Sequence, residues 1–125
     1  MPKMEIRSNQ APPPGGAYSQ ALRVGDFVYV SGVGPKHPET GEIPDTIEEQ
    51  TALVLECIRN ILGVADARME DVVKSTVHLS DLSLFQRFNA EYARWFPEPR
   101  PVRTTVGSQL PGIMVEIDVV AWTGE

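Results

Sequence analysis

Hydrophobic and polar positions alternate in some stretches of the chain and recur at helical spacing in others. Two extended stretches, Tyr18–Arg23 and Phe27–Ser31, flank Gly25-Asp26, a pair typical of a tight hairpin turn. Because the second stretch opens with four strand-forming residues in a row, this strand is expected to be covered on both faces. A short edge strand is expected around Glu5–Arg7, before a loop rich in proline and glycine.

Two segments carry apolar residues at every third or fourth position, which predicts amphipathic helices. The first covers Asp45–Ala65, where Asp45 is the expected N-cap and Glu48 follows at capping-box spacing. The second covers Leu82–Phe96 and stops before Pro97, which cannot continue a helix.

The remaining periodic segments predict strands over Asp71–Leu79, Val102–Val106 and Met114–Trp122. Alternation in the first of these puts Val73, Ser75, Val77 and Leu79 on one face, and Val72, Lys74, Thr76 and His78 on the other. The order of elements is β-β-α-β-α-β-β with an extra short strand at the start. This order predicts an α+β domain, a mixed sheet with two helices on one face.

Two helices leave the second face of such a sheet uncovered. The last strand is apolar on one face, yet its other face also holds Val120 and Trp122 beside Glu116 and Asp118. A homo-oligomer that packs the bare sheet faces together is the simplest way to shelter these side chains.

Length and charge narrow the range of functions. The 125 residues are expected to form a single domain, residues 1–125, with 42% hydrophobic and 22% charged residues. A net charge of −6 disfavours binding to nucleic-acid backbones or anionic membranes. The lone Cys57, the lack of a secretory signal and the lack of a long apolar run predict a soluble, cytoplasmic protein.

Most sequence signatures of catalysis are missing. No Walker-type loop occurs, and Pro35 follows Gly32-Val33-Gly34, so this segment cannot open a dinucleotide-binding helix. His37 and His78 lie far apart and no Cys/His spacing suits zinc, so no metal site is expected. Cys57 lies among apolar helix neighbours and is interpreted as a packed side chain rather than a nucleophile.

Two charged residues lie inside predicted strands, where a lone charge is costly. Arg103 lies within Val102–Val106 and Glu116 within the following strand. If these strands are antiparallel neighbours, the two side chains share a face and come within reach of each other. One interpretation is a solvated edge ion pair. The other is an arginine fork that binds a carboxylate, with Glu116 as the acid-base group beside it.

The segments around these residues resemble the Rid (YjgF-type) family of reactive-intermediate (enamine/imine) deaminases along nearly the whole chain. The matching segments are Ala17–Ala21, Tyr29–Gly32, Pro38–Pro44, Phe88–Tyr92, Trp95-Phe96, Pro101–Val106, Leu110-Pro111 and Val115–Asp118.

The resemblance implies a chorismate-mutase-like fold of the bacillus type. It also implies a homotrimer with a central barrel of sheets, helices outside and active sites between subunits. The residue roles that it implies are a substrate-carboxylate site at Arg103, a water-positioning Glu116, a pocket-closing Tyr18, a nearby Asn89, and backbone groups around Ser31, Gly32 and Thr105. Tyr18 also fits the interpretation of a packed strand aromatic. Asn89 also fits that of a helix residue that hydrogen-bonds a neighbouring loop. Thr105 stands where well-known members often have Cys, and the connection from Arg103 to Glu116 is shorter than theirs.

The implied reaction is cofactor-free hydrolysis of a 2-imino acid or its 2-enamine tautomer to a 2-keto acid and ammonia, 2-iminopropanoate being one such substrate. Three alternatives stay open. They are a specialised deaminase of a 2-aminomuconate-type compound, a non-catalytic module that binds keto acids, and a ribonuclease, which the acidic charge disfavours.

Overall fold

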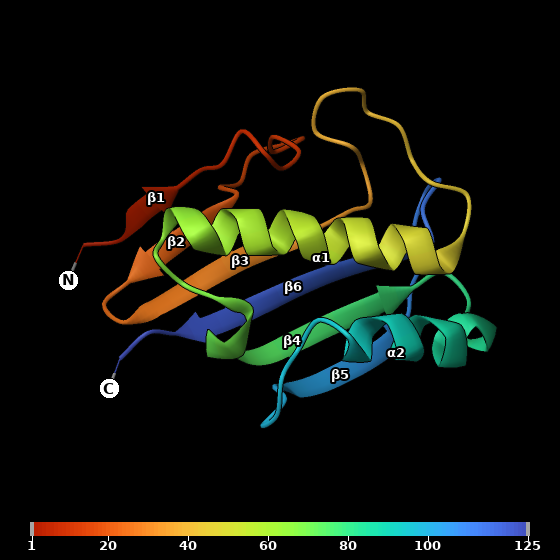
Figure 1. Cartoon of the computed structure of the whole chain (residues 1–125). Coiled ribbons are helices and arrows are strands. Elements are labelled where there is room, and N and C mark those ends of the chain that lie inside the picture. The colour runs from red at the N-terminus through yellow and green to blue at the C-terminus, as the bar shows by residue number, and fades with distance from the viewer. Residues whose placement is uncertain (1, 125) are drawn as a thin grey trace.

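The computed structural model describes residues 2–124 and shows a six-stranded mixed sheet with two helices in front of it (Figure 1). The strands are β1 (Met4–Ile6), β2 (Ala21–Val24), β3 (Phe27–Val33), β4 (Val72–Leu79), β5 (Val102–Gly107) and β6 (Val115–Trp122). The helices are α1 (Ile47–Val64) and α2 (Phe85–Ala93), and single 3₁₀ turns at Met69–Asp71 and Leu82–Leu84 precede β4 and α2. The predicted α+β class and order of elements are confirmed.

The strands lie in the order β1-β2-β3-β6-β4-β5. Only β4 and β5 are parallel, and α2 provides the crossover that a parallel pair requires. This crossover places β5 at the edge of the sheet, outside β4, while β6 inserts between β3 and β4. The expectation that the strands of Arg103 and Glu116 are antiparallel neighbours is therefore wrong, because β4 separates them.

Both helices cover the same face of the sheet (Figure 1). On that face the β6 side chains are fully buried, namely Val115, Ile117, Val119 and Ala121. We call the opposite side the bare face. There Phe27, Tyr29 and Trp122 are 40%, 46% and 40% exposed. In a single chain β3 is thus covered on one face only, not on both as its composition predicted.

Helix α1 begins one residue later than expected. Its N-cap is Thr46, not Asp45, and the Thr46 hydroxyl accepts a hydrogen bond from the Glu49 N–H at 3.1 Å. The Thr46 hydroxyl also donates to the Glu49 carboxylate at 3.1 Å, so both cap contacts go to Glu49 and not to Glu48. Glu48 is free to bind Arg87 of α2 through two contacts of 2.7 Å, which tie the helices together.

A register shift near the start of β4 changes its faces. The pairing with β6 is irregular between Val72 and Lys74, so Val72 is buried at 4% exposure and Val73 is 42% exposed. Strict alternation predicted the opposite for these two residues, since a bulge inserts one residue and reverses the faces before it. Beyond the bulge, Ser75, Val77 and Leu79 are buried as predicted.

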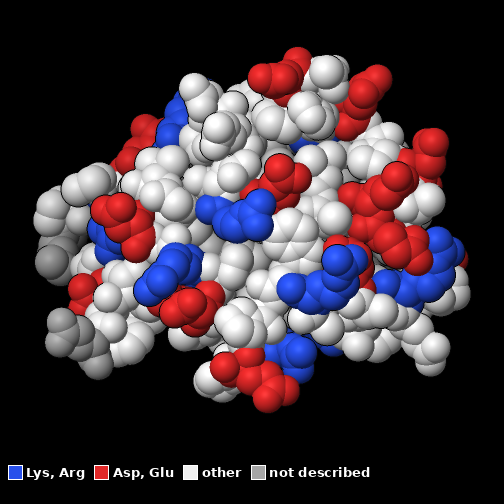
Figure 2. Space-filling view, viewed as in Figure 1, with Lys and Arg blue, Asp and Glu red and all other residues white. Residues whose placement is uncertain are grey.

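The outer side of the helical layer carries mixed charge. Figure 2 shows Lys and Arg side chains interspersed with Asp and Glu over this face. No helix within residues 2–124 has the length and apolar character needed to cross a membrane.

Candidate active site

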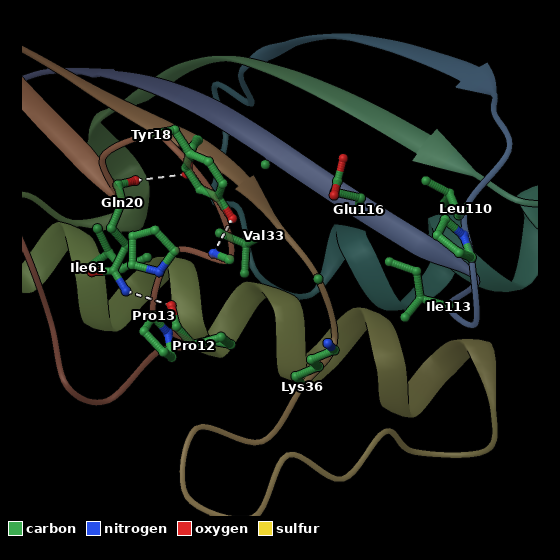
Figure 3. Close-up of a pocket in the computed structure, with 16 residues that line it drawn as sticks. Pro12, Pro13, Tyr18, Gln20, Val33, Lys36, Ile61, Leu110, Ile113 and Glu116 are labelled. Atoms are coloured by element: carbon green, nitrogen blue, oxygen red, sulfur yellow. Dashed lines mark hydrogen bonds between the residues drawn. The ribbon is translucent and has the colours of Figure 1, made fainter.

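A cavity of about 290 Å³ lies at the end of β3, where the proline-rich loop passes over the sheet (Figure 3). We call it the bulge pocket, because the β3–β6 pairing is irregular between Val30 and Val33. Four of the predicted site residues line it: Tyr18, Ser31, Gly32 and Glu116. The rest of the wall is mostly apolar and includes Pro12, Pro13, Val33, Ile61, Leu110 and Ile113, with Lys36 as its cation.

Tyr18 lies in the loop before β2, not in a strand, and is 52% exposed. Its hydroxyl accepts a hydrogen bond from the Gly15 N–H at 3.0 Å, so the ring bridges the loop over the pocket. The interpretation of Tyr18 as a packed strand aromatic is therefore wrong. An exposed aromatic ring at the edge of the pocket is suited to closing over a bound molecule.

Gln20 anchors the loop that forms the pocket wall. Its buried amide accepts from the Ser8 N–H at 2.7 Å and donates to the Pro12 carbonyl at 2.8 Å. The Ser31 hydroxyl donates to the Gln20 carbonyl at 3.1 Å, which joins the loop to the β3 bulge. The positioning role of Gln20 was not predicted, although its place in the matching segment Ala17–Ala21 was a usable signal.

Gly32 allows the Glu116 side chain to lie against the backbone of β3. A Cβ at Gly32 would lie 3.0 Å from both the carboxyl carbon and Oε1 of Glu116. Figure 3 shows the Glu116 carboxylate rising from β6 on the side away from α1. The glycine therefore makes room for the only carboxylate that lines the pocket among the described residues.

Arg103 occupies a different environment, under α2. Its guanidinium carbon lies 5.4, 5.6 and 4.6 Å from the ring centres of Phe85, Phe88 and Tyr92. The Tyr92 ring is the nearest of the three, and the hydrogen bond between the Tyr92 and Ser75 hydroxyls, 2.6 Å long, fixes its position. Burial raises the pKa of Tyr92. Within residues 2–124 Arg103 makes no ion pair, so the aromatic rings orient a cation that remains available for an anion.

Arg103 and Glu116 point to opposite faces of the sheet. Arg103 pairs with Ser75 on the helix-covered face, whereas Glu116 pairs with His78 on the bare face. Ser75 and His78 are three residues apart on one strand, and an odd separation reverses the face. The predicted pairing of the two side chains within one chain is therefore wrong.

Thr105 and Asn89 lie on the Arg103 side. Thr105 follows Arg103 by two residues, and its buried hydroxyl oxygen has no hydrogen-bond partner among the described residues. Asn89 follows Phe85 by one helical turn and precedes Tyr92 by another, so it flanks the rings over Arg103. The sequence predicted this segment only as an amphipathic helix, and the role of its aromatic rings in orienting Arg103 was missed.

The lone cysteine lies outside both places. Cys57 is buried in α1, and burial raises the pKa of its thiol to about 11, which agrees with a packed residue. Within residues 2–124 no three His, Cys, Asp or Glu side chains come together in a way that suits a metal ion.

Comparison with known proteins places the chain in a family. The family model described as Endoribonuclease L-PSP matches residues 8–123. A RutC family protein of Pyrococcus abyssi is 45% identical, with 98% of each chain covered. The Reactive Intermediate Deaminase A, chloroplastic, of Arabidopsis thaliana is 38% identical over 95% of this chain and 65% of its own. The crystal structure of Escherichia coli TdcF with bound serine has a TM-score of 0.91 and 31% identity, covering 97% and 99% of the two chains.

The fold, the described segments and these matches agree with the resemblance found in the sequence. The chain belongs to the L-PSP family, which is the Rid family and includes reactive intermediate deaminases.

Proposed function

We propose that this protein hydrolyses 2-imino acids, or their 2-enamine tautomers, to 2-keto acids and ammonia at sites built from two copies of the chain. The observation that carries the proposal is the opposite placement of Arg103 and Glu116. At its edge strand one copy offers Arg103, which makes no ion pair within residues 2–124, and another copy offers the Glu116 carboxylate in the bulge pocket. A site that uses both side chains therefore needs a second copy.

The bare face supplies the reason for self-association. Phe27, Tyr29 and Trp122 are large, half-exposed side chains on that face, and Tyr29 lies across from Val120 of β6. Contiguous apolar surface of this kind marks an interface. A closed ring of three copies would cover each bare face and bring the edge strand β5 of one copy toward the bulge pocket of the next.

Arg103 binds the substrate carboxylate in this mechanism. A guanidinium presents two parallel N–H donors to a carboxylate, and the rings of Phe85, Phe88 and Tyr92 restrict its orientation. Fixing one end of the substrate places the imine carbon at a defined distance from the opposite wall. Thr105 and Asn89 lie on the same side, and the buried Thr105 hydroxyl oxygen has no hydrogen-bond partner among the described residues.

Glu116 positions and deprotonates the attacking water. The water oxygen bonds to the imine carbon while one of its protons passes to the Glu116 carboxylate. The same proton then goes to the substrate nitrogen. As the carbon–nitrogen bond breaks, Glu116 takes the hydroxyl proton and passes it to the departing nitrogen, so the products are a 2-keto acid and ammonia and Glu116 is again a carboxylate. Tyr18 closes the pocket, whose apolar walls accept the substrate side chain.

Complementation between two inactive variants tests the shared site. Arg103→Ala and Glu116→Gln are each expected to lose most turnover of 2-iminopropanoate generated in situ, while Glu116→Gln still binds a 2-keto acid. When the two variants are unfolded together and refolded, activity should return to about a quarter of wild type, since random assembly restores one site in four. Sites contained within single chains would give no recovery.

A matched control separates the active-site arginine from a surface one. Arg94 is exposed and pairs only with Glu91 of its own helix, so Arg94→Ala should leave turnover within about twofold of wild type. Saturable keto-acid binding without ammonia release in the wild type would instead favour the binding-module alternative. Turnover restricted to 2-aminomuconate would favour the specialised deaminase. The net charge of −6 and the interspersed charges in Figure 2 offer little to an RNA backbone.

A further inference from the structure

Lys36 is the only cationic side chain that lines the bulge pocket among the described residues, and the mechanism above gives it no role. Figure 3 shows it below Glu116, on the segment that continues from β3. Lys36 makes no ion pair within residues 2–124, although the chain has 17 acidic residues against 11 basic ones. Its ammonium group is therefore available to an anion that enters the pocket.

The backbone around Lys36 is held against the pocket. The Lys36 N–H donates to the Gly34 carbonyl at 3.0 Å. A Cβ at Gly34 would lie 3.4 Å from Cδ1 of Ile113, so this turn packs on the pocket wall. On the other side, the His37 N–H donates to the Glu42 carbonyl at 2.9 Å and closes the following loop. The Lys36 backbone thus has a defined place, while its flexible four-carbon stem can adjust to a ligand.

Other polar side chains of the pocket are already bound within the chain. The Gln20 amide donates to the Pro12 carbonyl at 2.8 Å, and the Ser31 hydroxyl donates to the Gln20 carbonyl at 3.1 Å. The Glu116 carboxylate repels a negatively charged substrate side chain, whereas the Lys36 ammonium attracts one. Apolar walls with one ammonium group suit a short carbon chain that ends in a carboxylate.

We propose that Lys36 is a specificity-determining residue that favours 2-imino dicarboxylic acids, such as 2-iminosuccinate and 2-iminoglutarate, over 2-imino acids with an uncharged side chain. The inference rests on the proposed deaminase function. Arg103 of a second copy binds the carboxylate beside the imine carbon, and Lys36 binds the carboxylate at the end of the side chain. The cavity of about 290 Å³ is at the small end of ligand pockets, which favours short substrates.

Pairs of substrates that differ in charge but little in size test this role. Flavin oxidases generate 2-iminosuccinate and 2-iminoglutarate in situ from D-aspartate and D-glutamate, and the amide analogues from D-asparagine and D-glutamine. In the wild type, kcat/KM should be about tenfold higher for at least one acid than for its amide. Lys36→Met keeps the side-chain length without the charge and should lower this ratio to about one, whereas Lys36→Arg should keep most of it. A wild-type ratio near one for both pairs, or an unchanged ratio in Lys36→Met, overturns the proposal.

A control variant and a binding measurement separate this inference from the proposed function. Lys3→Met changes an exposed lysine before β1, outside the pocket, and should leave the ratio unchanged. By calorimetry, the matching 2-keto dicarboxylic acid, oxaloacetate or 2-ketoglutarate, should bind Lys36→Met about tenfold more weakly than wild type. If the wild type shows no turnover but this loss of affinity occurs, the deaminase function fails and the role of Lys36 in binding stands. If the wild type hydrolyses 2-iminopropanoate but both proteins bind the keto acid equally, the role of Lys36 fails and the deaminase function stands.

Discussion

The two faces of this sheet are built from the same strands but have different roles. On the helix-covered face, β6 contributes only buried aliphatic side chains, and Arg103 at the edge lies under aromatic rings. On the bare face the same strand contributes Glu116 and Asp118, next to half-exposed Trp122. The covered face holds the fold together and orients one cation, whereas the bare face carries Glu116 and the half-exposed aromatic side chains that we propose for acid-base chemistry and self-association. A strand with period two can encode both tasks in alternate residues.

The largest expected difference between the faces is in stability. Phe88→Ala opens a cavity in the covered face, where Phe88 is fully buried between Phe85 and Tyr92, and should lower the free energy of unfolding by about 3–5 kcal/mol. Trp122→Ala on the bare face should weaken self-association much more than it destabilises the single chain. Urea unfolding at several protein concentrations separates these effects. If the free energy of unfolding falls in both variants by an amount that does not depend on protein concentration, the comparison of the two faces is contradicted.

Arg103→Lys tests whether the rings orient a planar fork. Lysine keeps the positive charge but cannot present two parallel donors or stack on Phe85 and Tyr92 in the same way. Turnover of 2-iminopropanoate should fall about 100-fold, with the oligomer intact by size-exclusion chromatography. Turnover within threefold of wild type would mean that charge alone is sufficient.

Gly32→Ala tests the close approach of Glu116 to β3. The added methyl group would lie 3.0 Å from the carboxylate and push it out of place. We expect kcat/KM to fall about tenfold, because catalysis is sensitive to displacements near 1 Å. Gly63→Ala in α1 is the matched control, since a Cβ there meets nothing within 4 Å, and its activity should be unchanged. Equal activity in the two variants would remove the argument for Gly32.

The smallest effect concerns the surface contact between the helices. The hydrogen bonds from Arg87 lower the pKa of Glu48 from 4.5 to about 2. The folded state therefore gains stability above pH 4.5 and loses that gain as the pH falls toward 2. Wild type should exceed Arg87→Gln in Tm by about 2 °C or less at pH 7, because the pair is exposed, and the difference should vanish near pH 2. A difference that persists at pH 2 would rule out the ion pair as its cause.

Many residues of the candidate site could be predicted from the sequence. Tyr18, Ser31, Gly32 and Glu116 lie in one pocket, although they come from a loop and two strands. Arg103 and Thr105 were recognised as one strand segment and do share one face. The relation between these two sets was not predicted correctly, because it depends on which strand lies between them. The positioning role of Gln20 was also missed, since a buried glutamine leaves no periodic signal.

The sequence alone determined the elements, the hairpin at Gly25 and the family, because these depend on neighbouring residues and on local motifs, whereas α2 ends at Ala93 and not at the predicted Phe96. The tertiary structure decided the order of the strands, the bulge that exposes Val73 and the separation of Arg103 from Glu116. These features arise when segments far apart in the chain compete for the same edge of a sheet. Such competition is decided by the packing of the whole core and not by the periodicity of any one segment.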